Sequence, residues 1–73
     1  MSLADLMREY LGGAPNIVQV EPFISRIRVE VKDPGLVDAR GLKAVGAHGV
    51  VVAGSVVQVV VGPQAEELAA QLN

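Results

Sequence analysis

The sequence predicts an α+β domain, a two-layer sandwich in the order α-β-β-α-β-β-α, with helices on one face of a four-stranded antiparallel sheet. Three observations lead to this expectation. The run from Arg26 to Lys32 alternates between apolar and charged residues, as a strand with one wet face does. Two β-branched runs flank a Gly-Ser pair that favours a hairpin turn. Segments with apolar residues at helical spacing precede, separate and follow these strands.

The first helix is expected from about Ser2 to Leu11. Ser2 can cap its N-terminus, with Asp5 in the first turn, and Gly12-Gly13 followed by Ala14-Pro15 ends it. We place no weight on Met1–Leu3, which could come from expression. The apolar face of this helix consists of Leu3, Leu6, Met7, Tyr10 and Leu11.

The first hairpin begins with a short strand from Ile17 to Val20. Pro22 marks either the end of that strand or an exposed edge position, and Pro22 to Ser25 are expected to form the connection. The second strand is the alternating run described above. Its apolar residues, which point one way, are Ile27, Val29 and Val31, and its polar residues, which point the other, are Arg26, Arg28, Glu30 and Lys32.

A turn at Asp33-Pro34-Gly35 leads into a second helix, from Ala39 to Val45. Asp38 caps this helix and Gly46 ends it, with Leu42 and Val45 facing inward.

The second hairpin joins strands Gly49 to Ala53 and Val56 to Val61 through the Gly54-Ser55 turn. Apolar residues occupy nearly every position of both, so we expect central strands covered on most of both faces. A last helix opens at Gly62-Pro63, with two glutamates at the positive end of its dipole. Its glutamates are Glu66 and Glu67, and its buried stripe is Ala65, Leu68, Ala69 and Leu72.

Composition limits the function. Seventy-three residues leave room for one core, so residues 1–73 form one domain. Cysteine is absent and His48 is the single histidine, so we expect no disulfide, no metal site and no cofactor. A net charge of −2 gives no reason to expect nucleic-acid binding. Because no apolar run approaches the ~20 residues of a membrane span, and because acidic residues interrupt the N-terminal apolar ones, we expect a cytoplasmic domain.

Few side chains are candidates for chemistry. Arg26 and Arg28 lie about 7 Å apart on one strand face, a spacing that lets two guanidinium groups flank a phosphoryl or carboxylate group. Spacing alone favours an ordinary solvated face. Gln58 could face a ligand or be satisfied by backbone or solvent. His48 and Ser25 lack an activating partner at a suitable spacing, so a surface histidine and a turn serine fit better than a base or a nucleophile.

The segment from Asn16 to Asp33 resembles the signature of the IIB domain of the bacterial phosphoenolpyruvate-dependent sugar phosphotransferase system, of the glucose, N-acetylglucosamine and sucrose–glucoside type. That signature contains Asn and an apolar residue, a fixed gap, Cys-x-Thr-Arg, alternating apolar positions and a closing acidic residue. The similarity covers the chain from about Leu6 to Leu72, and it implies the same fold. Further matching stretches are Val37-Asp38, Gly41-Leu42-Lys43, Val45-Gly46-Ala47, Gly49 to Gly54, Val57-Gln58-Val59 and Val61-Gly62.

The resemblance also implies a site. In the family, the cysteine takes a phosphoryl group from a phosphohistidine of the IIA protein and passes it to the sugar held by the membrane IIC domain. Phe23 occupies that slot here, and a benzyl group has no lone pair with which to attack phosphorus. Ser25 replaces the threonine and keeps a hydroxyl. Arg26 and Arg28 match arginines that would stabilise thiolate and phosphoryl charge, and Gln58 matches a glutamine near the same site.

Three functional readings follow, and we rank them in this order. In the first, which the resemblance implies, the chain would be a IIB component that lacks its acceptor, naturally or by a Cys-to-Phe change, would be inactive in transfer and would serve in regulation or docking. Its partners would then be IIA and IIC, and IIC would hold it at the inner face of the membrane. Alternatively, it is a small module that binds an anion or acidic peptide. Least supported is phosphorylation on Ser25 or His48. Phe23 would suit an interface or fold equally well against apolar neighbours.

Overall fold

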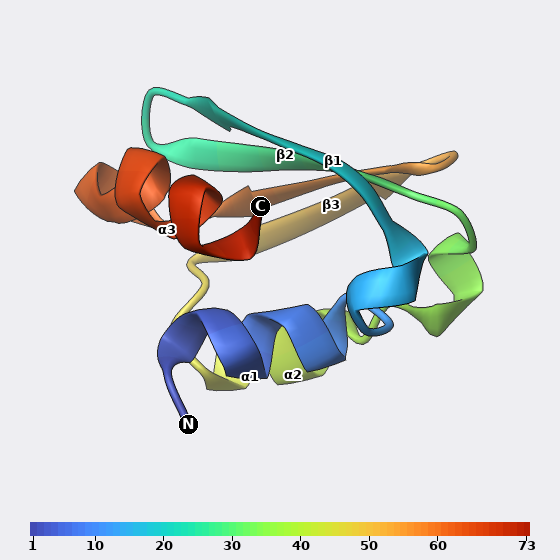
Figure 1. The fold of residues 1–73 in the computed structure, drawn as a ribbon. Helices are drawn as coiled ribbons and strands as arrows, with labels where there is room; N and C mark the ends of the chain where they lie inside the picture. The colour runs from blue at the N-terminus through green and yellow to red at the C-terminus, as the bar shows by residue number, and fades with distance from the viewer.

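The computed structural model describes residues 1–73 and has the predicted element order and fold class. The four strands form one antiparallel sheet in the order β1-β2-β4-β3. Short 3₁₀ turns precede β1, α2 and α3 (Figure 1). The elements are α1 (Leu3–Tyr10), β1 (Ile17–Phe23), β2 (Arg26–Val31), α2 (Ala39–Ala44), β3 (Gly49–Ala53), β4 (Val56–Val60) and α3 (Ala65–Leu72).

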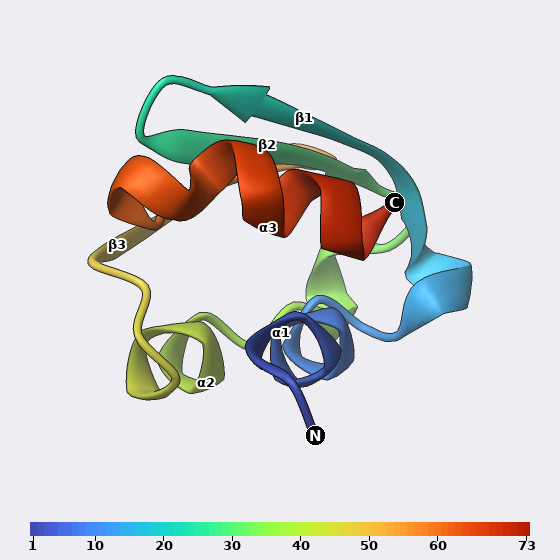
Figure 2. The same ribbon diagram turned by 60° about the vertical axis from the view of Figure 1, so that its left-hand side comes forward.

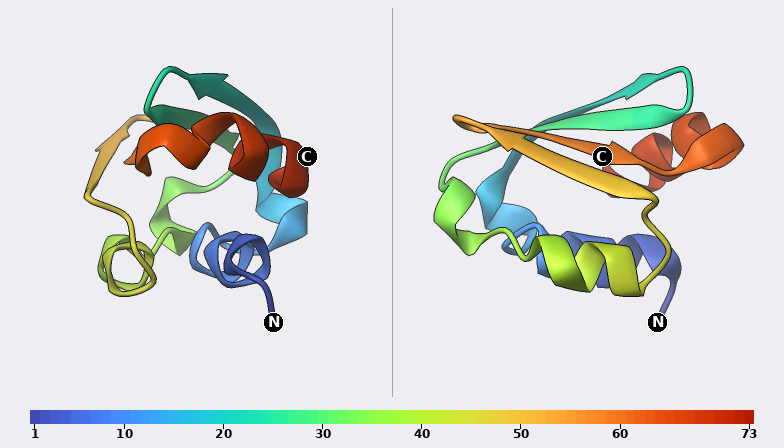
Figure 3. Two further views of the ribbon diagram at one scale, coloured as in Figure 1. Left: turned by 90° about the vertical axis from the view of Figure 1, so that its left-hand side faces the viewer. Right: turned by 180° about the vertical axis from the view of Figure 1, so that it is seen from behind.

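All three helices lie on one side of the sheet (Figures 2 and 3). Helix α3 packs directly on β1 and β2, α2 reaches the sheet at β3, and α1 contacts both other helices. The opposite side of the sheet is left uncovered, as the alternation of β2 predicts. Both α1 and α3 have eight residues, and none of the helices has the length and apolar character that crossing a bilayer requires.

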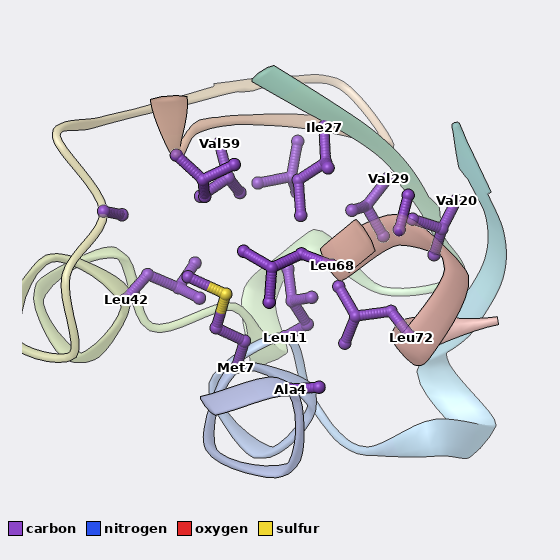
Figure 4. Close-up of a cluster of buried hydrophobic side chains, with 14 of the residues drawn as sticks. Ala4, Met7, Leu11, Val20, Ile27, Val29, Leu42, Val59, Leu68 and Leu72 are labelled. Carbon is purple, nitrogen blue, oxygen red and sulfur yellow. The ribbon is translucent and has the colours of Figure 1, made fainter. Parts of the chain in front are cut away.

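The core lies between the sheet and the helices. Ile27, Val29 and Val31 of β2 are each no more than 2% exposed, because strand alternation directs all three to the helices. The predicted stripe of α3 is buried. In α1 the buried residues are Ala4 and Met7, and Leu11 is buried directly after the helix ends, whereas Leu3, Leu6 and Tyr10 are half-buried. Figure 4 shows the side chains of Ile27 and Val29 from the sheet meeting those of Leu68, Leu11 and Met7 from the helical side. Burying each large aliphatic side chain contributes about 1.5–3 kcal/mol.

Asn16 is the one buried polar residue, and it ties the end of α1 to the end of β2. Its Nδ2 donates to the carbonyls of Leu11 (2.8 Å) and Asp33 (3.1 Å), and its Oδ1 accepts from the Asp33 N–H (2.8 Å). The side chain lies where a Cβ at Gly12 would stand, 2.5 Å away, which explains why glycine is required there. The asparagine of the signature is therefore a structural clamp.

Strand β1 extends further than expected. It continues through Pro22 to Phe23, so the connection is Ile24-Ser25 alone. The Val31 N–H bonds to Ser55 and the Val61 N–H to Ser25, which places the odd-numbered β2 residues in hydrogen-bonded pairs with β4. Successive residues of a strand bond to opposite neighbours, so Ile27 bonds to β4 and not to β1. Pro22, which lies opposite Ile27 on β1, therefore exchanges no backbone hydrogen bond with it. The edge position is thus the correct alternative for Pro22, since its missing N–H would face solvent.

The prediction that the second hairpin forms two central strands covered on most of both faces is wrong in two respects: no helix covers the outer face of either strand (Figures 2 and 3), and β3 is not central. Strand β4 is central, but β3 lies at the edge of the sheet with Val51 58% and Val52 45% exposed. Boundaries also differ by a residue or two. Helix α2 ends at Ala44, β4 ends at Val60, and Pro63 lies in the 3₁₀ turn before α3.

Candidate functional site

The uncovered side of the sheet, which we call the open face, is defined by strand register. Residues directly opposite one another in antiparallel strands share a face, so each set of paired positions forms a row across the sheet. The row nearest the β1–β2 turn contains Phe23 and Arg26, and the next contains Glu21, Arg28 and Gln58. The full rows are Phe23, Arg26, Val60 and Gly49; then Glu21, Arg28, Gln58 and Val51; then Gln19, Glu30, Val56 and Ala53.

The β1–β2 turn presents two large apolar side chains to solvent. Phe23 is 64% exposed and Ile24 is 89% exposed. Ile24 also has a φ of +60°, a left-handed conformation that a β-branched residue rarely adopts. Since the two-residue loop has a positive φ at its first position only, it matches a type II′ turn, which favours glycine there. The exposure of Phe23 goes against the alternative in which it folds onto apolar neighbours.

Ser25 holds this turn to the end of β4. Its carbonyl accepts the N–H groups of Val61 (3.0 Å) and Gly62 (2.8 Å). The Ser25 hydroxyl makes no hydrogen bond within the protein, to a basic side chain or to any other group. Its backbone therefore has a structural task, and the hydroxyl stays free.

The two arginines differ in their partners. Arg26 donates from Nη1 to Gln58 Oε1 at 3.0 Å, a diagonal contact between β2 and β4. Gln58 is therefore satisfied by a side chain rather than by backbone, and its amide nitrogen stays free to donate. Arg28 lies between Glu21 and Gln58 in register but forms neither a hydrogen bond nor an ion pair within 4 Å. All the donors of its guanidinium are available to a ligand.

A shallow open hollow of about 550 Å³ lies over these residues. Two arginines and one glutamate in its lining leave a net charge of +1, which favours an anion but only modestly in an open, solvated site. The lining contains no thiol, hydroxyl or imidazole, so it can hold an anion, and the only nucleophile it offers is the weakly nucleophilic carboxylate of Glu21. The lining residues are Glu21, Phe23, Arg26, Arg28, Ala53, Val56 and Gln58.

The structure thus brings Phe23, Arg26, Arg28 and Gln58 together and leaves Ser25 and His48 outside the lining. His48 is exposed just before β3, with its backbone N–H bonded to Val60. Sequence reasoning missed Glu21, whose place follows from the alternation of β1. Had β1 been continued through Pro22, both Glu21 and Phe23 would have fallen on the arginine face.

Comparison with known proteins supplies related sequences. The family described as "phosphotransferase system, EIIB" matches residues 7–38. The chain is 52% identical to the "PTS system N-acetylglucosamine-specific EIIB component" of Streptomyces coelicolor, over 86% of this chain and 82% of that protein. It is 45% identical to the "PTS system glucose-specific EIICBA component" of Staphylococcus saprophyticus, over 80% of this chain but only 9% of that longer protein.

A likeness to a solved structure supports the fold. A crystallised domain of the IIabc component of the PTS system from Clostridium difficile superposes with a TM-score of 0.77, covering 96% of this chain and 70% of that one. At 21% identity, this likeness supports the fold alone.

Proposed function

The chain belongs to the EIIB family of the phosphotransferase system, and we propose that it keeps the docking and anion-holding surface of an EIIB domain without being able to carry a phosphoryl group. The observation that carries this proposal is the position of Phe23. It ends β1 on the open face, opposite Arg26, and in the signature that the sequence resembles, this position would belong to the acceptor cysteine.

Chemistry supports the loss of transfer. A phosphoryl acceptor must offer a lone pair to phosphorus, and the lining of the hollow contains no thiol, hydroxyl or imidazole but only the weakly nucleophilic carboxylate of Glu21. The Ser25 hydroxyl lies outside this lining and makes no hydrogen bond to a base that could activate it. The two guanidinium groups remain, so the site would stabilise the charge of a phosphoryl group that it cannot accept.

Exposure supports a role in docking. Phe23 and Ile24 are the most exposed large apolar residues beyond the first residue of the chain, and they adjoin the hollow. An exposed aromatic residue beside arginines is typical of the centre of a protein interface. We propose that a IIA protein or a IIC domain contacts this surface, as the names of the EIICBA relatives suggest.

The proposal is tested by restoring the sulfur. Wild-type protein and F23C are incubated with phosphorylated IIA protein, and intact mass is measured. In F23C the introduced thiolate attacks phosphorus, the P–N bond of the phosphohistidine breaks, and the imidazole keeps the electron pair and takes up a proton. We expect one phosphoryl group on F23C and none on the wild type. V18C, an exposed cysteine on the same strand outside the hollow, is the matched control and should gain none.

The outcomes separate the three readings. Labelling of the wild type on Ser25 or His48 would contradict the proposal and favour a substitute acceptor. Failure of F23C to gain a phosphoryl group while it remains folded would show that the site or docking surface has decayed. Equal labelling of V18C would show that the reaction is not directed by the open face.

A second candidate function is binding of a small anion without any phosphotransferase partner, and the unpaired guanidinium of Arg28 favours it. Titration with inorganic phosphate, followed by amide shifts, tests this reading. Shifts centred on Arg28 that R28A abolishes would support it. Arg40, an exposed arginine on α2, supplies the control variant R40A, which should leave phosphate binding unchanged.

A further inference from the structure

Strand β3 has the composition of an interior strand but occupies an edge. Every residue from Gly49 to Ala53 is apolar or glycine, and Val51 and Val52 are 58% and 45% exposed. Natural edge strands are usually protected from pairing by charges, proline or a bulge. β3 has none of these, so its outer side is an unprotected pairing surface.

The other edge of the same sheet shows what protection looks like. Strand β1 has a register shift between Ile17 and Gln19, which leaves Val18 as an extra residue, and it carries Glu21 and Pro22. A bulge, a charge and a proline each oppose the addition of another strand. The two edges of one small sheet therefore differ sharply in their readiness to pair.

The backbone groups available on β3 follow from the sheet register. Odd-numbered residues of β4 form their backbone hydrogen bonds with β2, so the even-numbered residues of β4 form theirs with β3. The bonded residues of β3 are Gly49, Val51 and Ala53, which lie opposite Val60, Gln58 and Val56. The N–H and C=O groups of Val50 and Val52 then point away from the sheet. These groups must be satisfied by water or by another strand.

The sequence of β3 is self-complementary in this geometry. In an antiparallel pair of two copies with the dyad at Val51, each Val50 lies opposite Val52 of the second copy, and Gly49 lies opposite Ala53. Such a pair brings each outward N–H to an outward C=O, because Val50 and Val52 are the residues with free groups. No charge faces another charge, and the contact closes on itself as a two-fold interface requires.

We propose that β3 is a homodimerisation edge, at which a second copy of this chain pairs antiparallel about Val51 to form a continuous eight-stranded sheet. The pairing would place the open faces of both copies on the same side, because the valines at the dyad belong to that face. Its small contact predicts a weak, reversible dimer rather than an obligate one.

The test uses the whole chain at high concentration. Sedimentation equilibrium of the wild type should show a monomer–dimer equilibrium, and the Val50 and Val52 amides should shift with concentration. A mixture of isotope-labelled and unlabelled protein should give an intermolecular contact between the Val51 α-protons. V51K places like charges directly opposite one another and should weaken the dimer about tenfold or more.

V18K is the matched control, because it makes the same charge change at an exposed valine of the other edge. It should leave the dimer intact. A wild type that stays monomeric with unshifted Val50 and Val52 amides would overturn the proposal, as would association that persists in folded V51K. Assembly beyond the dimer would contradict the closed two-fold contact.

Discussion

The two hairpin turns share a backbone conformation but not a sequence. Ile24-Ser25 joins β1 to β2, and Gly54-Ser55 joins β3 to β4, each as a two-residue loop closed by a directly opposed pair. The first residue of each has a φ of +60°. Glycine adopts that conformation without steric cost, whereas a β-branched residue is strained in it.

This difference indicates that folding stability alone does not explain the presence of isoleucine at position 24. The β3–β4 turn has the sequence that a type II′ turn favours. The β1–β2 turn keeps a costly isoleucine and exposes both it and Phe23, although neither side chain is buried in the core. Strained residues persist where surrounding structure holds them, and they concentrate at functional sites. Both turns border the arginine hollow, the first through Phe23 and the second through Ala53 and Val56, but only the β1–β2 turn holds a strained residue.

The largest expected effect on stability comes from the buried side of β2, the strand that follows the strained turn. Ile27 follows Arg26 on β2 and is fully buried, so I27A should lower the free energy of unfolding by about 2–5 kcal/mol. Its neighbour Arg28 points to the open face, and R28A should change stability by no more than about 0.5 kcal/mol. Urea unfolding of both variants measures the contrast. Similar losses would contradict the assignment of the two faces.

Exchanging the turn residues tests the comparison directly. G54I places a β-branched side chain at a φ of +60° in the relaxed turn, and nothing lies within 4 Å of the added Cβ. The cost is therefore backbone strain, and we expect a loss of about 1–2 kcal/mol. Thermal unfolding measures it. An unchanged melting temperature would mean that this φ is not enforced by the hairpin.

The reciprocal change should have the smallest effect and the opposite sign. I24G relieves the strain and loses little burial, since the side chain is 89% exposed, but glycine also adds freedom to the unfolded chain. We expect a gain of up to about 1 kcal/mol in the free energy of unfolding. A loss of stability would show that Ile24 makes stabilising contacts that outweigh its strain.

Much of the fold could be predicted from local patterns. The alternation of β2 fixed its buried side, and Ser2 and Asp38 cap α1 and α2 as expected. Strand order could not be predicted this way, because apolar composition alone does not distinguish a central strand from an edge strand, and β3 was therefore misplaced. The end of β1 was predicted too early for a related reason. A proline ends a strand only where its missing N–H would face the paired neighbour, and the sequence does not show on which side β1 is paired.

The site was predictable in part. Arg26 and Arg28 lie on one strand, so alternation places them together. Ser25 and Gln58 stood out in the sequence pattern without a role, and the family resemblance added Phe23 and linked all three to one site. The bond between Arg26 and Gln58 depends on the register of β2 with β4, which no local pattern gives. The roles of these residues in binding and transfer stay predictions.

The central claim is that the open face around the strained turn docks a partner while the helix-covered face only supports it. The most direct test is titration of isotope-labelled wild-type protein with unphosphorylated IIA protein, followed by amide shifts. The account predicts shifts at Phe23, Ile24, Arg26 and Arg28, with α1 and α2 unaffected. Shifts confined to those two helices, or none at saturating IIA, would contradict it.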